Sequence, residues 1–248
     1  MIRQHLVLMF ILYFSCMSCG TAMKKSAASA KISEASIQTT DKLQSENSLQ
    51  QLKKHFSQRI KEIDPEALET GLKAYMCATH AQRQGKGRYL TIIDYNQPSS
   101  QKRMYIIDMV HQKLISSQLV AHGQNTGGRE ALKFSNKDGS HQSSLGVFVT
   151  QTPYRGKHGL SLRLRGLERG YNDNASQRAI VLHGANYVNQ DYVRKYGMIG
   201  RSWGCPAIDN SQVKTTVNTL KSGSIIVAYF KDNQWLSKSN YLHCKVSA

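Results

Sequence analysis

The chain has 248 residues, of which 40% are hydrophobic and 20% charged; these ordinary values exclude a largely disordered protein. Lys and Arg number 33 against 16 Asp and Glu, so the formal net charge at pH 7 is +17, which favours an anionic partner. The cations are scattered, and no basic patch is interleaved with aromatic residues. We therefore expect no nucleic-acid partner and favour an anionic cell-envelope polymer.

The N-terminal residues 1–19 predict an export signal. Arg3 supplies an early positive charge, and an apolar run from Leu6 to Phe14 follows it. This run is too short for a membrane span of ~20 residues. The signal is either an ordinary cleaved one or a bacterial lipoprotein signal with Cys19 as the lipidated residue. Both alternatives place the protein in the periplasm or cell envelope, with membrane contact only through a lipid anchor.

Two segments precede the main domain. Residues 20–48 are rich in Ala, Ser, Thr, Lys and Gln without an apolar face, which predicts a flexible tether. Residues 49–88 predict a helical segment, in which Asp64 is the N-cap and Pro65 the first helical residue. We expect the helix to end near Gly85 and to place these side chains on one face: Leu68, Leu72, Tyr75 and Met76.

Residues 89–248 predict a mainly β domain. Short runs rich in β-branched and aromatic residues recur, separated by Gly, Asn, Asp, Pro and Ser. One helix-like segment, 211–220, precedes the last run. This pattern predicts a β-sandwich or open barrel with an N-terminal helix and one short helix before the last strand. The runs are YLTIIDY, RMYIIDMV, LISSQLVAHG, LGVFVTQTPY, GLSLRLRGL, AIVLHGA and SIIVAYF.

The stretch GRSWGCPA, residues 200–207, places a cysteine in a tight polar turn, where a cysteine kept only for packing is not expected. A nucleophilic cysteine needs exposure, a base or cation that favours the thiolate, and donors aimed at the developing oxyanion. Gly204 allows close approach of the backbone, and we expect the N–H groups of Gly204 and Cys205 to be free for the oxyanion. His183, at the end of the run AIVLHGA, is the candidate base.

The motifs HGANYVN and GRSWGCPAI resemble the His…Ser-x-Gly-Cys signature of bacterial L,D-transpeptidases, and in particular the murein L,D-transpeptidase catalytic-domain family. The resemblance extends over about Tyr89 to Tyr229, through IIDYNQPSS, HGQNTGG, FSNKDGSHQSSLGVF and YRGKHGLSLRLRGLERGYNDNA. It implies an L,D-transpeptidase-like fold whose thiolate attacks peptidoglycan stem peptides after their third residue, forming an acyl-enzyme that an amine resolves. By position, Cys205 is the nucleophile, His183 the base and Gly204 the oxyanion turn.

The chain departs from that signature at two places. Better-known members carry a histidine where this chain has Trp203, and an arginine shortly after the cysteine that this chain lacks. We expect Arg201 to replace that arginine as the clamp for a substrate carboxylate. Trp203 is expected to line the substrate groove, and Ser202 to brace the turn by a hydrogen bond to His183.

Other functions and roles stay open at this point. A cysteine hydrolase, either an L,D-carboxypeptidase or an endopeptidase, would use the same residues, and an inactive wall-binding lipoprotein would use the fold and its positive charge for adhesion. His122, His141 and His158 fit no compact zinc spacing, so we expect structural or substrate-facing roles for them and neither a metal nor a cofactor. Cys77 and Cys244 either pair in an oxidising envelope or stay separate.

Overall fold

The computed structural model describes residues 46–81 and 87–244, which lie within one compact unit, Asp41–Ala248. The predicted export signal and the lipidation candidate Cys19 lie outside these residues, as does most of the predicted tether. Among the described helices, none combines the length and the apolar character that crossing a membrane requires.

Helix α2, Pro65–Met76, begins as the sequence predicts. The side chain of Asp64 accepts hydrogen bonds from the first free backbone N–H groups, and Pro65 occupies the first turn. The α-helical geometry ends at Met76, and a π-helical turn, η1 (Cys77–Ala81), follows it directly; the predicted end near Gly85 lies outside the described residues. The four residues expected on one face are all buried: Leu68, Leu72, Tyr75 and Met76.

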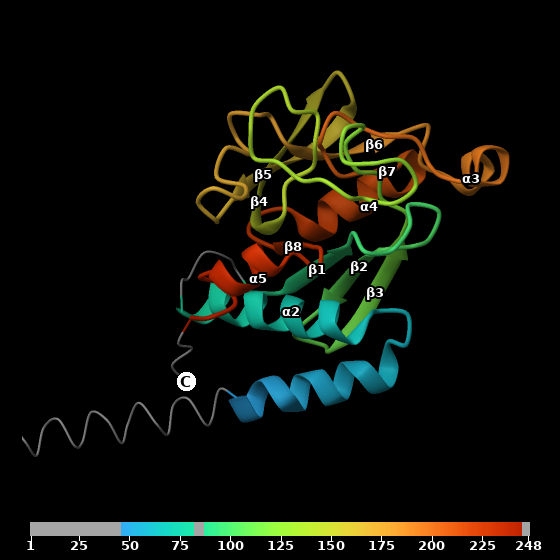
Figure 1. The fold of residues 1–248 in the computed structure, drawn as a ribbon. Helices are drawn as coiled ribbons and strands as arrows, with labels where there is room; N and C mark the ends of the chain where they lie inside the picture. The colour runs from blue at the N-terminus through green and yellow to red at the C-terminus, as the bar shows by residue number, and fades with distance from the viewer. Residues whose placement is uncertain (1–45, 82–86, 245–248) are drawn as a thin grey trace, which may run out of the picture. The chain divides into compact units, whose positions relative to one another are not determined.

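A second helix, residues 46–59, precedes α2. Its Phe56 is fully buried in the same hydrophobic core as α2, and Lys53 forms an ion pair with Glu69 of α2. The predicted helical segment therefore contains two helices that pack on each other (Figure 1).

The eight strands of the described residues form one sheet, in the order β3-β2-β1-β8-β4-β5-β6-β7. The pairs β1–β8 and β6–β7 are parallel, and the other neighbours are antiparallel. A bridge between Ala121, after β3, and Ala207 of β7 nearly closes the sheet into a barrel. The bounds are β1 Tyr89–Asp94, β2 Met104–Asp108, β3 Lys113–Gln118, β4 Gly146–Gly156, β5 Gly159–Gly166, β6 Val181–Ala185, β7 Ala207–Asp209 and β8 Ile225–Tyr229.

This arrangement confirms the prediction of an L,D-transpeptidase-like fold and selects the open barrel over the sandwich; the described chain as a whole is mixed α/β. Helix α2 packs against β1 and β8, whereas α4 (Asn210–Leu220), the helix predicted before the last strand, packs against β5, β6 and β7 (Figure 1). Three short elements were not expected from the sequence: strand β7, α3 (Gln190–Tyr196) and α5 (Asn233–Lys238).

The C-terminal end of the described chain is fixed in two ways. Cys77 and Cys244 form a disulfide, with their Cα atoms 6.0 Å apart, so the paired alternative is correct. The buried carboxylate of Glu168 accepts hydrogen bonds from the indole N–H of Trp235 in α5, at 3.1 Å, and from the hydroxyl of Ser239. Helix α5 and the residues after it are therefore held against the barrel.

Candidate active site

The turn that carries Cys205 can be built only with glycine at position 204. Gly204 has φ of +122°, a backbone conformation that residues with a side chain rarely adopt. A Cβ at this position would also lie 2.7 Å from the carbonyl oxygen of Gln142. The loop that contains Gln142 thus packs directly against the backbone at position 204. This close contact leaves no room for a side chain, which explains why a glycine precedes the cysteine.

Hydrogen bonds from serine side chains hold this turn. The hydroxyl of Ser202 donates to the carbonyl oxygen of Cys205 at 2.6 Å and accepts from the N–H of Gly204 at 3.1 Å. Ser143 donates to the carbonyl oxygen of Gly204 at 3.2 Å. Ser202 therefore braces the turn, but the expected bond to His183 is wrong, and so is the expected freedom of the Gly204 N–H. The Cys205 N–H makes no hydrogen bond to another described residue.

A buried pair of side chains, His122 and Arg103, supports the turn. The backbone N–H of Ser202 donates to the carbonyl of His122 at 2.9 Å. His122 is itself only 1% exposed; its Nδ1 accepts from the guanidinium of Arg103 at 2.8 Å, and its Nε2 donates to the carbonyl of Gly128 at 3.0 Å. Burial, and then the charge of Arg103, lower the pKa of His122 to about 4. His122 is therefore a neutral structural histidine.

His183 reaches the site on β6, the parallel neighbour of β7. It is in register with Ala207, and its backbone N–H donates to the carbonyl of Pro206 at 3.3 Å, so it stands beside the residues that follow the nucleophile candidate. Its Nδ1 lies 2.8 Å from the carbonyl oxygen of Gly184. Because a carbonyl can only accept, Nδ1 carries the proton and Nε2 is left as the basic nitrogen.

The thiol of Cys205, the free cysteine of the described residues, is half-buried and bonded to the backbone at the start of β6. The N–H of Val181 donates to Sγ at 3.4 Å, and Sγ donates to the carbonyl of Ala179 at 3.7 Å. The structure thus brings Cys205 next to the strand of His183, but the hydrogen-bond partners of Sγ are backbone groups and not the imidazole. Burial raises the pKa of the thiol, against the lowering effects of the Val181 N–H, Arg178 and Lys157.

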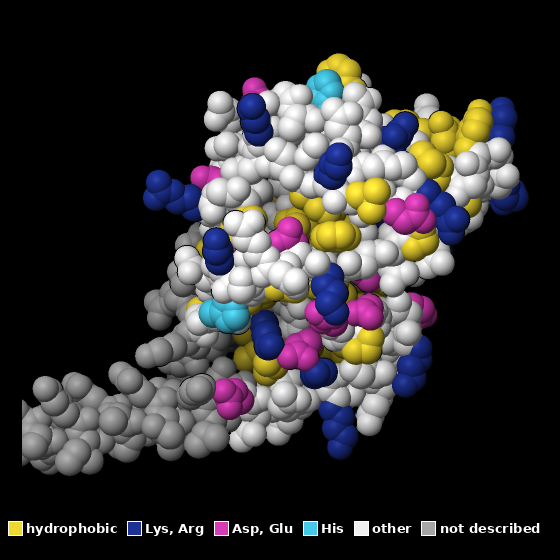
Figure 2. All heavy atoms as spheres, in the orientation of Figure 1, with side chains coloured by type: hydrophobic (Ala, Val, Ile, Leu, Met, Phe, Trp, Pro, Cys, Tyr) yellow, Lys and Arg dark blue, Asp and Glu magenta, His cyan; other side chains and the backbone are white. Residues whose placement is uncertain are grey.

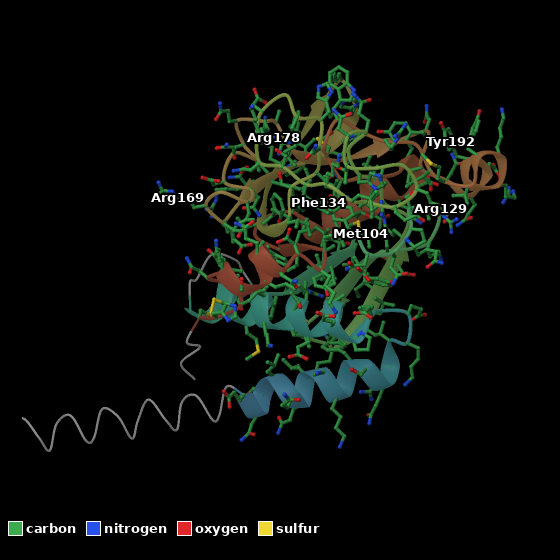
Figure 3. The ribbon with its side chains drawn as sticks, viewed as in Figure 1. Met104, Arg129, Phe134, Arg169, Arg178 and Tyr192 are labelled. Carbon is green, nitrogen blue, oxygen red and sulfur yellow. A yellow bond between two sulfur atoms is a disulfide. The ribbon has the colours of Figure 1, made fainter. Side chains whose placement is uncertain are left out.

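Arg178 is a site residue that the sequence analysis missed. Its guanidinium donates to the carbonyls of Ser135, at 2.8 Å, and Gln142, at 2.6 Å, and so fixes the loop that presses on the nucleophile turn. One of its nitrogens lies 3.2 Å from the point where a Cβ of Gly204 would stand. Figure 3 labels this side chain in the β5–β6 half of the barrel. Arg178 places a cation beside Cys205. No local sequence motif around Arg178 indicates this role.

The turn between β4 and β5 forms one rim of the site. His158 stacks on His183, with the ring centroids 4.4 Å apart. Burial is the largest cause that lowers the pKa of His183, and the neighbouring His158 and Lys157 lower it further. Lys157 also lies over the ring of Trp203, 5.7 Å from its centroid. The β4–β5 turn therefore spans from the candidate base to the candidate nucleophile turn.

Trp203 of the nucleophile turn also contacts His141. Their rings stack with centroids 4.8 Å apart, and Trp203 is 67% exposed, so it is not a core residue. Arg201 points to a different side: its guanidinium donates to the carbonyls of Gln124 and Gly127, at 3.3 and 3.1 Å. Arg201 also lines a cleft of about 290 Å³, together with Gln124, Tyr192, Tyr196, Met198 and Gly200.

The described residues contain no group of three or more His, Cys, Asp or Glu side chains placed to hold a metal ion. The chemistry that this arrangement can supply is that of a thiol, an imidazole and two neighbouring cations.

Several solved structures resemble the chain at low similarity. An L,D-transpeptidase from Mycobacterium smegmatis has 10% identity and a TM-score of 0.36, covering 58% of this chain and 59% of its own. The helical cell shape determining protein Pgp2 from Campylobacter jejuni has 10% identity and a TM-score of 0.33, covering 59% of this chain and 45% of its own. An L,D-transpeptidase from Stackebrandtia nassauensis has 13% identity and a TM-score of 0.35, covering 73% and 77%. The chain spans about half the length of the first two. No curated protein matches it.

The family comparison is more extensive. The model of the L,D-transpeptidase catalytic domain matches residues 59–229, well over half of the chain, and this range contains both His183 and Cys205. The family consists of cell-wall enzymes that act on peptidoglycan stem peptides, typically with a cysteine. The chain belongs to the L,D-transpeptidase catalytic domain family.

Proposed function

We propose that this protein is an exported L,D-transpeptidase that cleaves and transfers peptidoglycan stem peptides through an acyl-enzyme on Cys205. The observation that supports it most is the thiol of Cys205 at a glycine-dependent turn, next to the strand whose His183 has its Nδ1–H fixed by the Gly184 carbonyl. A thiol in such a turn, with a basic nitrogen on the neighbouring strand, is suited to acyl transfer.

In the proposed first step, the thiol leaves its backbone partners, and Nε2 of His183 takes its proton. The thiolate attacks the carbonyl carbon of the third stem residue, and the Cys205 N–H donates to the oxyanion that forms. Collapse of this intermediate expels the amine of the terminal D-residue, which takes the proton back from His183. Attack of an acceptor amine on the thioester then forms the new peptide bond and restores the thiol.

The cations beside the thiol support this mechanism. Arg178 and Lys157 both lower the pKa of Cys205, against the effect of burial. A thiolate is a far better nucleophile than a thiol, so the two cations increase its population at neutral pH. Arg201, Ser202 and Trp203 complete the proposed site: Ser202 fixes the turn, Trp203 lines the groove, and Arg201 binds an acidic part of the substrate.

Export to the periplasm or cell envelope is supported by the disulfide and by the charge. A disulfide between Cys77 and Cys244 persists in an oxidising compartment and is unusual in a reducing one. The net charge of +17 favours retention on anionic envelope polymers, and Figure 2 shows Lys and Arg scattered over one face without a continuous basic band. Anchoring through a lipid on Cys19 belongs to the same proposal.

Mass spectrometry tests the reaction. The mature protein is incubated with a tetrapeptide stem, with and without an amine acceptor, and we expect the mass of the tripeptide acyl group on Cys205 and its transfer to the acceptor. Cys205→Ala should form no adduct, and His183→Ala should slow acylation by ~100-fold or more. Release of free tripeptide, whether or not an acceptor is present, would identify a hydrolase. A folded protein that binds sacculi but takes up no acyl group would be an inactive wall binder.

A further inference from the structure

A cleft lies next to the nucleophile turn. The cleft of about 290 Å³ is formed by α3, by residues 198–201 that lead into the turn, and by Gln124. Neither Cys205 nor His183 lines it, so it is separate from the reacting groups. Its volume is just below the ~300–1,000 Å³ range of small-molecule sites, which suits one ring-sized group rather than a long chain.

Two tyrosine rings form the aromatic part of this cleft. Tyr192 and Tyr196, both from α3, have ring centroids 4.5 Å apart and planes inclined by 45°. Tyr196 is 54% exposed although it is a large aromatic side chain. Figure 3 labels Tyr192 at the base of α3, and Figure 2 shows apolar side chains together with Lys and Arg in this region. Exposed aromatic faces beside polar groups offer a stacking surface for a ligand.

The exposed aromatic residues are concentrated around the nucleophile. Among the described large apolar side chains that are clearly exposed, the aromatic ones are Tyr196 and Trp203, and both flank the turn of Cys205. A Cβ on Gly200 would lie 2.6 Å from the side chain of Tyr187, so the loop between them packs closely on that side chain.

The polar part of the cleft is cationic. Arg201 donates from one guanidinium nitrogen to backbone carbonyls, which orients the group and leaves its other N–H groups for a ligand. Lys195, which does not line the cleft, places its ammonium group over the ring of Tyr196, 5.1 Å from its centroid, so a ligand can stack only on the part of that ring that Lys195 leaves uncovered. The acid of α3, Asp191, is paired with Arg194. A carboxylate or amide oxygen on the ligand would therefore meet donors and positive charge.

We propose that this cleft binds an N-acetyl amino-sugar ring of the wall glycan, the one whose lactyl group is joined to the stem peptide by an amide bond. The C–H face of a sugar ring packs on tyrosine, and its lactyl and N-acetyl oxygens accept hydrogen bonds from Arg201. The inference rests on the proposed function, because the sugar belongs to the same substrate. The reacting carbonyl is three residues from the sugar, a reach of ~10 Å, and the cleft is built by residues that immediately precede the nucleophile turn.

The test compares two donors in the acylation of Cys205. Rates are measured by intact mass for a free tetrapeptide and for the disaccharide–tetrapeptide, which adds N-acetylglucosamine and N-acetylmuramic acid. For the wild-type protein we expect the sugar-bearing donor to be faster by ~10-fold at subsaturating concentration. Tyr196→Ala should reduce this ratio to about 1, whereas Tyr196→Phe, which keeps the ring, should preserve it. Val110→Ala, a change at a 65% exposed apolar residue in another part of the chain, is the matched control and should keep the wild-type ratio.

The outcomes separate this inference from the proposed function. A wild-type protein acylated equally fast by both donors overturns the glycan site and leaves the transpeptidase intact. A ratio that survives in Tyr196→Ala also overturns it. If neither donor acylates the protein, the proposed function fails, and calorimetric titration of Cys205→Ala with the peptide-free disaccharide decides the site. If the disaccharide binds to Cys205→Ala and no longer binds when Tyr196→Ala is added, the glycan site in this cleft is supported. If the disaccharide does not bind to Cys205→Ala, the glycan site is overturned.

Discussion

His158 lies almost face to face with His183, with ring centroids 4.4 Å apart and ring planes inclined by 25°. His158 comes from the turn between β4 and β5, and His183 from β6, so a surface turn covers the candidate base. This cover removes the imidazole of His183 from water, and burial is the main reason that its pKa lies below the ordinary value.

Removing the covering ring should change the pH dependence of the reaction. A lowered pKa keeps His183 neutral, and therefore basic, to a lower pH. In His158→Ala, better hydration and the loss of a neighbouring titratable ring should raise the pKa of His183, so the acidic limb of kcat/KM should move to higher pH. His158→Phe, which keeps a stacked ring, should stay closer to the wild type. The measurement is the acylation rate between pH 4.5 and 8, and an unmoved limb in His158→Ala would contradict the proposed role.

His122 should make the stability of the protein pH-dependent. Its pKa is about 4 in the folded protein and ~6.5 when unfolded, so only the unfolded chain takes up the proton between these values. The contribution of the neutral histidine, about 3 kcal/mol, is therefore complete above pH ~6.5 and is lost as the pH falls to about 4. Urea unfolding at pH 7.5 and pH 4.5 measures this loss. His122→Gln, which can still accept from Arg103 and donate to Gly128, should reduce the difference, whereas the exposed control His243→Gln should not.

Arg178 should influence the reactivity of the thiol as well as the position of its loop. Without the guanidinium, the pKa of Cys205 should rise further, because a cation that favours the thiolate is lost. Alkylation by iodoacetamide at pH 7 should slow by roughly an order of magnitude in Arg178→Gln and less in Arg178→Lys. The rate at high pH, where the thiol is ionised in all variants, should stay similar. Equal slowing at every pH would instead mean that Arg178 acts only by holding the loop.

Gly204→Ala should damage the site far more than an ordinary Gly→Ala change. The added Cβ would lie 2.7 Å from the Gln142 carbonyl, at a φ of +122°. We expect a loss of about 1–3 kcal/mol in stability and of at least ~10-fold in acylation, since the Cys205 N–H would move. Gly170 is a matched control, because its φ is +83° but nothing lies within 4 Å of its Cβ position. Gly170→Ala should lower the melting temperature slightly and leave acylation unchanged.

The elements that could be predicted from sequence are those specified by local patterns. β-branched runs marked the longer strands, and the pair Asp64 and Pro65 marked the start of α2. Strand β7 has three residues, Ala207–Asp209, and gives no periodic signal; it is a strand because it pairs with β6. The parallel pairing of β1 with β8 joins segments more than 130 residues apart, which no local pattern encodes.

The candidate site likewise contains residues that local sequence predicts and residues that it does not. Cys205 and Gly204 were predicted because a cysteine in a tight polar turn is an unusual pattern, which a few neighbouring residues are enough to reveal. Arg178 was missed because its role depends on a loop around Gln142 that approaches only in the folded chain. The Gly204 N–H looks free in sequence but donates to the hydroxyl of Ser202, a local contact that depends on the conformation of the folded turn.

The disulfide between Cys77 and Cys244 has a consequence for survival among the proteases of an envelope. All eight strands lie between its two cysteines, so the chain from η1 to the C-terminal end of the described residues forms one covalent ring. A single cut in an exposed turn, such as the one between β4 and β5, opens the ring but releases no fragment. The two halves of a nicked molecule stay joined, and the barrel can hold the pieces in place until a second cut or a reductant separates them.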